Sequence, residues 1–215
     1  ISGTRSNLAE SKRSTSYIAT NIYAEFEDTL NEVHNFKVMG GWNYEKSQAK
    51  EIYGYNDDLL TEDVENINLA LGTDNRKITS SWNAYQFGGA FFRLNYDFDN
   101  RYLLEVNGRY DGSSRFPENE RWAFFPSASA GWRISEEPWF NVESKYVSNA
   151  KLRFSWGSLG NAAGLSNYQY KQTLGISTSS FILNGLRQNY MSSPAALPGS
   201  LTWETATTWD VGADL

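Results

Sequence analysis

The stretch that decides the fold is residues 82–111, WNAYQFGGAFFRLNYDFDNRYLLEVNGRYD. Apolar and polar residues alternate along its first half, where Phe92 and Leu94 stand between Arg93 and Asn95. A period of two indicates a β-strand, because successive side chains of a strand point to opposite faces. The first half of the stretch is therefore predicted to be a strand with two chemically different faces.

The second half of the stretch repeats the pattern after an interruption at residues 99–100. Leu104 and Val106 lie on one face there, and Glu105 and Asn107 on the other. The Asp-Asn pair at 99–100 is a turn signal. Two antiparallel strands joined by a tight turn are predicted.

The same alternation recurs along the chain and predicts seven strands, at residues 16–28, 35–47, 82–98, 101–114, 124–135, 150–158 and 203–215. Their connections are unequal in a regular way. Short turns at 29–34 and 99–100 and a moderate one at 136–149 fall on one side, and long polar connections at 48–81, 115–123 and 159–202 on the other. Short turns opposite long loops are typical of an outer-membrane β-barrel.

Aromatic residues gather at the predicted strand ends. One group holds Tyr96, Phe98 and Tyr102, and the opposite group holds Trp82, Tyr110 and Phe124. Two such belts mark the two water interfaces of a membrane barrel. The fold class is therefore predicted as all-β, an antiparallel transmembrane β-barrel wall of about seven strands of a larger barrel. The alternative is a soluble β-sandwich, in which glycines within the strands would mark bulges.

Parity assigns the two faces of this wall. The lipid face is predicted to carry Ala90, Leu104, Val106, Ala128 and Phe154. The lumen face is predicted to carry Arg93, Glu105, Asn107 and Arg109, because charges that face hydrocarbon are expensive.

Composition excludes several other classes. The 215 residues contain 19 Lys and Arg against 25 Asp and Glu, a net charge of −6, which argues against a binder of duplex nucleic acid. Cysteine is absent and there is one histidine, so the chain has no disulfide framework, zinc–thiolate site or polyhistidine metal site. There is also no apolar run of the roughly 20 residues that a transmembrane helix needs. No signal peptide is visible at Ile1, which opens a polar stretch.

No catalytic constellation is recognisable, and we expect no enzyme, cofactor or metal site. His34 lies in a short turn without a nucleophile motif, and Glu118 and Glu120 fit a surface loop better than a glycosidase pair. The acidic run within 57–65 does not have the spacing of an EF-hand, so a solvated acidic loop is expected.

Binding residues are predicted at the loop side. The most specific local motif is DGSSRF at 111–116. Its Asp111 and Arg115, with Arg109 just before it, could bind cargo hydroxyls; a purely structural turn is the alternative. Exposed aromatic rings on the long loops are the other candidates because sugar rings stack on them: Tyr53, Tyr55, Tyr168, Tyr170 and Tyr190.

Five motifs in order carry a family resemblance: NRYLLEV (100–106) with RYDGSSRF (109–116), FPSASAGWRI (125–134), EPWF (137–140), KLRFSWGSLGN (151–161), and LTWET with TTWDVG (201–212). In this order they resemble the SusC/RagA-like TonB-linked outer-membrane proteins of Bacteroidetes, over roughly residues 16–215.

The resemblance implies a TonB-dependent nutrient importer in the outer membrane of a Gram-negative bacterium. Its cargo would be an oligosaccharide or, in some members, a peptide. Its partners would be a SusD-like surface lipoprotein, the TonB complex acting through a plug, and outer-membrane lipid. No plug is recognised within 1–215, and single-chain bacterial barrels have an even number of strands. We therefore expect the chain to be part of one barrel domain. The rival hypothesis is a soluble β-rich carbohydrate-binding module.

Overall fold

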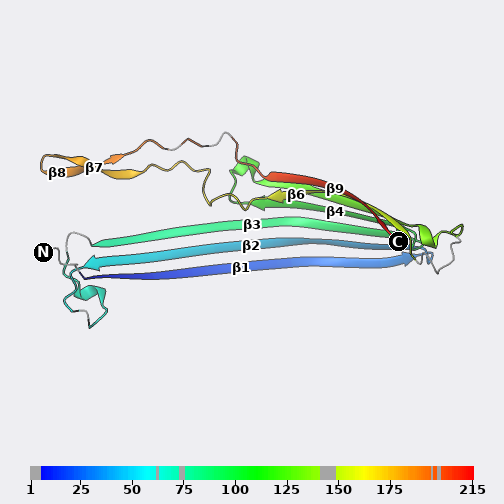
Figure 1. Ribbon diagram of the computed structural model, residues 1–215, viewed down its shortest axis with the longest axis horizontal. Coiled ribbons are helices and arrows are strands. Elements are labelled where there is room, and N and C mark those ends of the chain that lie inside the picture. The colour runs from blue at the N-terminus through cyan, green and yellow to red at the C-terminus, as the bar shows by residue number, and fades with distance from the viewer. Residues whose placement is uncertain (1–5, 62, 73–75, 141–148, 195, 198–199) are drawn as a thin grey trace. The chain divides into compact units, whose positions relative to one another are not determined.

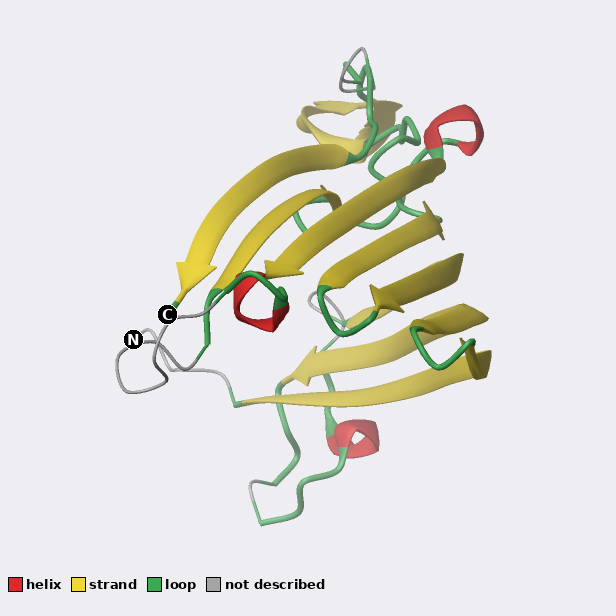
Figure 2. Ribbon diagram, turned by 90° about the vertical axis from the view of Figure 1, so that its right-hand side faces the viewer, coloured by secondary structure: helices red, strands yellow, loops and turns green. Residues whose placement is uncertain are grey.

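The computed structural model describes residues 6–61, 63–72, 76–140, 149–194, 196–197 and 200–215. Antiparallel strands dominate, with three short 3-10 turns, η1 (Ile67–Leu69), η2 (Glu118–Glu120) and η3 (Ile134–Glu136) (Figure 2). The strands are β1 (Asn7–Leu30), β2 (His34–Asp57), β3 (Lys77–Phe98), β4 (Tyr102–Ser113), β5 (Trp122–Arg133), β6 (Lys151–Asn161), β7 (Ile176–Leu183), β8 (Leu186–Met191) and β9 (Glu204–Asp214) (Figure 1). No helix in the described residues is long and apolar enough to cross a membrane.

Seven of these strands form one sheet in the order β1-β2-β3-β4-β5-β6-β9, and β7 pairs only with β8 in the described part of the chain. The sheet is not closed, because β1 and β9 are its outer strands there. The predicted all-β antiparallel class and the seven wall strands are confirmed. The chain divides into two compact units, residues 1–19 with 45–85, and residues 20–44 with 86–215.

In the second unit the turns joining successive strands lie together at the end of the sheet that holds the C-terminus (Figure 1). Asp99 and Asn100 both have positive φ, 52° and 56°, as in the turns whose twist suits a tight hairpin. The Asp99 amide donates to the carbonyl of Val33 in the neighbouring turn at 2.7 Å. The predicted short turns are therefore confirmed, whereas residues 141–148 of the predicted connection 136–149 lie outside the described residues.

The pairing registers sort the side chains into the two predicted faces. One cross-strand row from β3 to β9 holds Leu94, Val106, Ala128, Trp156 and Trp209. The adjacent row holds Arg93, Asn107, Ser127, Gly157 and Thr208. The apolar face is exposed, with Trp209 at 73% and Phe154 at 47%. A soluble sandwich would bury this face in its core, so the soluble alternative is wrong.

Aromatic contacts border the apolar face of the second unit at both ends. At the turn end, Tyr102 stacks on Trp132 with ring centroids 6.5 Å apart. At the other end, Tyr110 stacks on Trp122 at 5.3 Å, and Trp42 lies 6.4 Å from Trp122. Tyr102 and Tyr110 are about 27 Å apart along their strand at about 3.4 Å per residue, close to the roughly 25 Å apolar band of a membrane barrel. The two predicted belts are confirmed in this unit, but Trp82, predicted for the outer belt, is eight residues along β3 from Ala90, the partner of Tyr110, so its assignment to that belt was wrong.

The first three strands are longer than predicted. β1, β2 and β3 have 24, 24 and 22 residues, about twice the 9–11 that a membrane-spanning strand needs. Residues 48–57 and 77–81, predicted as loop, therefore belong to β2 and β3, and Tyr53 and Tyr55 are strand residues. In residues 45–48 of β2, polar side chains stand at both parities, so the apolar alternation fades while the strand continues.

The connection between β2 and β3, in the first unit, is held by several hydrogen bonds. An isolated bridge pairs Leu59 with Ala70, and the Asn56 side-chain amide donates to the Ala70 carbonyl at 3.1 Å. The Leu71 amide donates to the carbonyl of Asp58 at 2.9 Å. Turn η1 is capped by Asn66, whose side chain accepts from the Asn68 amide. These bonds fold the connection back on the strand that precedes it.

A buried carboxylate ties the turn-end belt together. Glu137, 7% exposed, lies in the turn after η3. Its Oε1 accepts from the Tyr102 hydroxyl at 2.6 Å and from the Trp132 indole N–H at 2.9 Å, and its Oε2 pairs with Arg101 at 3.2 Å. The hydrogen bonds from Tyr102 and Trp132, helped by Arg101, lower the pKa of Glu137 despite its burial. The EPWF motif thus has a structural role.

The contacts of the Glu137 carboxylate predict that the stability of the protein falls at acid pH. A carboxylate whose pKa is lower in the folded state adds stability above its unfolded pKa, about 4.3, and loses it as pH falls through the folded value. The parent protein should be more stable than the Glu137→Gln variant at neutral pH, and the gap should close below about pH 4. Urea midpoints of both proteins in detergent at each pH measure this. Glu136→Gln, at the exposed neighbouring position, is the control. If the stability difference between the parent and Glu137→Gln stays constant down to acid pH, the Glu137 carboxylate does not have this stabilising role.

Candidate functional site

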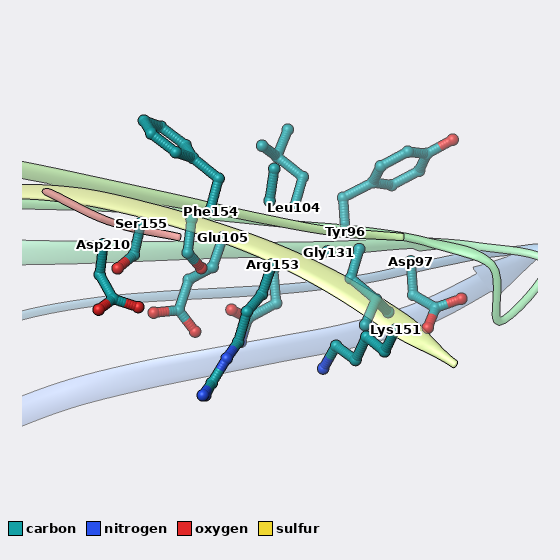
Figure 3. A pocket seen from close by; sticks show the side chains of 14 residues that line it. Tyr96, Asp97, Leu104, Glu105, Gly131, Lys151, Arg153, Phe154, Ser155 and Asp210 are labelled. Carbon is teal, nitrogen blue, oxygen red and sulfur yellow. The ribbon is translucent and has the colours of Figure 1, made fainter. Parts of the chain in front are cut away.

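The candidate site is the polar face of the second unit and the loops that border it. In Figure 3 Glu105 and Arg153 point to one side of the sheet, and Leu104 and Phe154 point to the other. Two adjoining hollows of about 520 and 440 Å³ lie on the polar face. Their shared lining includes Glu105, Ser129 and Ser155. Short side chains on β5 and β6 leave this space open.

Hydrogen bonds orient the charged residues that border the hollows. The Arg93 Nε donates to Asn107 Oδ1 at 2.7 Å, and the Asn107 amide donates to Glu105 Oε1 at 2.8 Å. On the first two strands, Lys37 pairs with Glu25 at 2.8 Å. The predicted placement of Arg93, Glu105 and Asn107 together on the polar face is confirmed by these contacts.

Arg109 and Asp111 are brought together as neighbours on this face. Arg109 donates to both carboxylate oxygens of Asp111, at 3.0 and 2.9 Å, and to Asn43 Oδ1 at 3.2 Å. Asp111 is 6% exposed, whereas the Arg109 side chain is 42% exposed. A Cβ at Gly89 would lie 2.0 Å from Asp111 Oδ1, so only glycine there leaves room for the carboxylate. Asp111 therefore orients Arg109, which keeps an accessible surface.

The DGSSRF motif folds into the buried core of this unit. Phe116 is fully buried and packs on Trp203 with ring centroids 4.9 Å apart, and Phe125 lies 5.3 Å from Trp203. The Trp203 indole N–H donates to the Arg121 carbonyl at 2.9 Å. Spacing in the sequence gives no sign of this cluster, because its members come from connections far apart in the chain.

Arg115 anchors a second loop to that core. Its Nε donates to Asn167 Oδ1 at 3.0 Å, and its Nη1 donates to the Ala162 carbonyl at 3.2 Å. These two partners, an amide oxygen and a backbone carbonyl, give Arg115 a structural role in the turn. Arg115 acts here as a support for the loop that carries Tyr168 and Tyr170.

The candidate tyrosines occupy two different places. Lys171 Nζ lies 5.4 Å from the Tyr168 ring centroid and 5.9 Å from that of Tyr170. Tyr170 also lines a hollow of about 190 Å³ with Glu120. Tyr190 lies on β8, within the hairpin found inside the connection predicted as loop at 159–202, and is 53% exposed. The Asn-Gly pair at 184–185, with φ of 53° and 78°, is the sequence signal that reveals this hairpin.

An antiparallel sheet with an exposed apolar face, two aromatic belts and a polar opposite face defines the wall of a transmembrane β-barrel. A family model described as TonB dependent receptor-like, beta-barrel, matches residues 2–215. The chain belongs to this family of outer-membrane receptors and transporters of Gram-negative bacteria, which are not enzymes.

Curated relatives give the same result. TonB-dependent receptor SusC of Bacteroides thetaiotaomicron is 30% identical over 217 residues, covering 99% of this chain and 20% of that protein. TonB-dependent receptor P26 of Formosa agariphila is 30% identical over 196 residues, covering 88% of this chain and 19% of that protein. The chain spans about a fifth of the length of these relatives.

Solved structures share the fold. A structure of the RagAB peptide transporter matches with a TM-score of 0.79 at 22% identity, over 95% of this chain and 22% of that one. The RagAB peptide importer in its closed-closed state matches with a TM-score of 0.81 at 20% identity, over the same shares of the two chains. The resemblance to SusC/RagA-like proteins is confirmed.

Proposed function

We propose that residues 1–215 form part of the barrel domain of a TonB-dependent importer that brings an oligosaccharide across the outer membrane with a SusD-like surface lipoprotein. The observation that carries this proposal is the two-faced sheet. Its apolar face suits lipid, and its polar face presents oriented donors such as Arg93 and Arg109 beside open hollows. Energy would come from TonB, acting through a plug on the side of the membrane opposite the long loops.

The loops are proposed to carry cargo and lipoprotein contacts. Loops of this length within a framework of tight turns are usually functional. Tyr168 and Tyr170 lie on a loop held by Arg115, and Tyr190 lies on the β7–β8 hairpin. Rings stack on sugars, and Asn and Ser side chains around them bind hydroxyls. A peptide cargo is the second candidate, favoured by the fold shared with the RagAB peptide transporter.

Deleting residues 173–193 tests the loop assignment. The segment holds the β7–β8 hairpin, whose base is closed by the Ser192 amide donating to the Gly175 carbonyl at 2.9 Å. Removal leaves every pairing of the seven-stranded sheet in place. We expect normal insertion into the outer membrane, unchanged TonB engagement, and cargo uptake or lipoprotein affinity reduced about tenfold, equivalent to about 1.4 kcal/mol of binding free energy.

Cells that express the full-length protein provide the measurement. Uptake of labelled oligosaccharide, co-purification of the lipoprotein and cross-linking to TonB are compared between the parent and the deletion. A TonB-deficient strain should lose uptake in both. A deletion strain that imports cargo at the parental rate, with the lipoprotein still bound, removes the role assigned to this hairpin.

A further inference from the structure

Three neighbouring strands of the first unit each contribute one side chain to a tyrosine–glutamate–tyrosine cluster. Glu45 on β2 accepts a hydrogen bond from the Tyr85 hydroxyl of β3 at 2.7 Å. The same Glu45 carboxylate is hydrogen-bonded to the side chain of Tyr17 on β1. One carboxylate thus holds two phenol groups, one from each flanking strand. None of these residues belongs to the motifs discussed above.

Strand parity places the cluster on the polar face. Tyr85 and Arg93 are separated by an even number of residues along β3, so they share a face. Glu45 likewise shares a face with Asn43, the residue that accepts from Arg109. Within their strands, Tyr85 and Glu45 therefore have the parity of the polar residues and not of the apolar ones.

On β3 the cluster lies outside the stretch Phe87–Phe98 that pairs with β4. On β3, Gly88 pairs with Gly112, which pairs with Trp122 of the outer aromatic belt. Tyr85 is three residues from Gly88 along β3, about 10 Å at about 3.4 Å per residue.

The rings are accessible although their hydroxyl groups are engaged. Tyr17 is 57% exposed, and Glu45 and Tyr85 are half-buried. A carboxylate offers about four acceptor positions, which is more than two phenol donors occupy. Hydrogen bonds to Glu45 limit the rotation of both tyrosines, and a site ordered before binding loses less entropy when its ligand arrives.

We propose that Tyr17, Glu45 and Tyr85 form a binding site for one pyranose ring of an oligosaccharide on the first unit. The C–H face of the sugar would stack on the tyrosine rings, and Glu45 would accept hydrogen bonds from sugar hydroxyl groups. This inference rests on the proposed import function and names a contact point for its cargo class. If the cluster only linked the strands by hydrogen bonds, it would need the tyrosine hydroxyl groups but not the exposed ring of Tyr17.

The test uses the purified full-length protein in detergent on an array of plant, algal and bacterial oligosaccharides. The parent should retain at least one glycan, and Tyr17→Ala or Tyr85→Ala should each weaken that binding about tenfold. Tyr17→Phe keeps the ring and should retain most of the affinity. Trp82→Ala removes another exposed aromatic side chain of β3, three positions from Tyr85 and so on the opposite face, and should leave binding unchanged.

Stability is controlled by comparing thermal midpoints of all variants, and Tyr85→Phe replaces Tyr85→Ala if the latter does not fold. Alanine variants that bind like the parent, retention of no glycan, or binding of an oligopeptide mixture instead of glycans each overturn the inference. TonB-dependent uptake of a peptide without glycan binding would leave the import function intact while removing this site. Glycan binding without TonB-dependent uptake would support this site and contradict the proposed import function.

Discussion

Replacing Trp203 with alanine should lower the free energy of unfolding of the full-length protein by about 3–5 kcal/mol, the range for removing a large aromatic side chain from a core. Trp203 is 8% exposed and contacts the rings of Phe116, Phe125 and Phe87, the last with centroids 6.1 Å apart. Its removal opens a cavity where the DGSSRF turn meets the start of β9.

Urea unfolding in detergent, followed by tryptophan fluorescence, measures this effect. Trp203→Phe keeps a ring but loses the hydrogen bond to the Arg121 carbonyl, and should cost about 0.5–1.5 kcal/mol for that bond. Trp209→Ala is the matched control, because Trp209 is six residues further along and 73% exposed on the apolar face. Equal losses for Trp203→Ala and Trp209→Ala would show that the buried cluster does not stabilise the barrel.

The wall from β3 to β5 was predictable because each strand there has one face in lipid and one in water. Because of this difference, apolar and polar residues alternate along each strand, as Phe92, Arg93 and Leu94 do. The outer part of β2 has no such contrast: residues 45–48 read Glu-Lys-Ser-Gln, polar on both faces, although they continue the strand. A method based on apolar periodicity therefore ends the strand too early.

The candidate site was predictable in its location but not in its contacts. Asp111 and Arg115 carry charges in a specific motif, which is compatible with ligand binding and with internal pairing. Their roles depend on partners that lie far away in sequence: Arg115 binds the carbonyl of a residue 47 positions later, and Trp203 binds one 82 positions earlier. A single sequence contains no record of such pairings. The tyrosines on β1 and β3 were missed for the same reason.

Placing arginine at Val106 should destabilise the protein by about 2–4 kcal/mol if this site lies near the middle of the bilayer. Val106 lies midway between the belt residues Tyr102 and Tyr110 on β4, and its cross-strand neighbours are Leu94 and Ala128. The described cross-strand neighbours on that face carry no charge, and a guanidinium this far from either interface must desolvate or thin the bilayer around it.

The matched control places the same charge one step away in the sheet. Ser129 pairs across the strands with Glu105 on the polar face, so the arginine of Ser129→Arg meets water and a carboxylate. Refolding of both full-length variants into phosphatidylcholine vesicles from urea compares their stabilities in a bilayer. Val106→Arg should lose stability and Ser129→Arg should change little. If Ser129→Arg proved the more destabilising, the two faces would be exchanged, with the polar row meeting lipid and the apolar row lining the lumen.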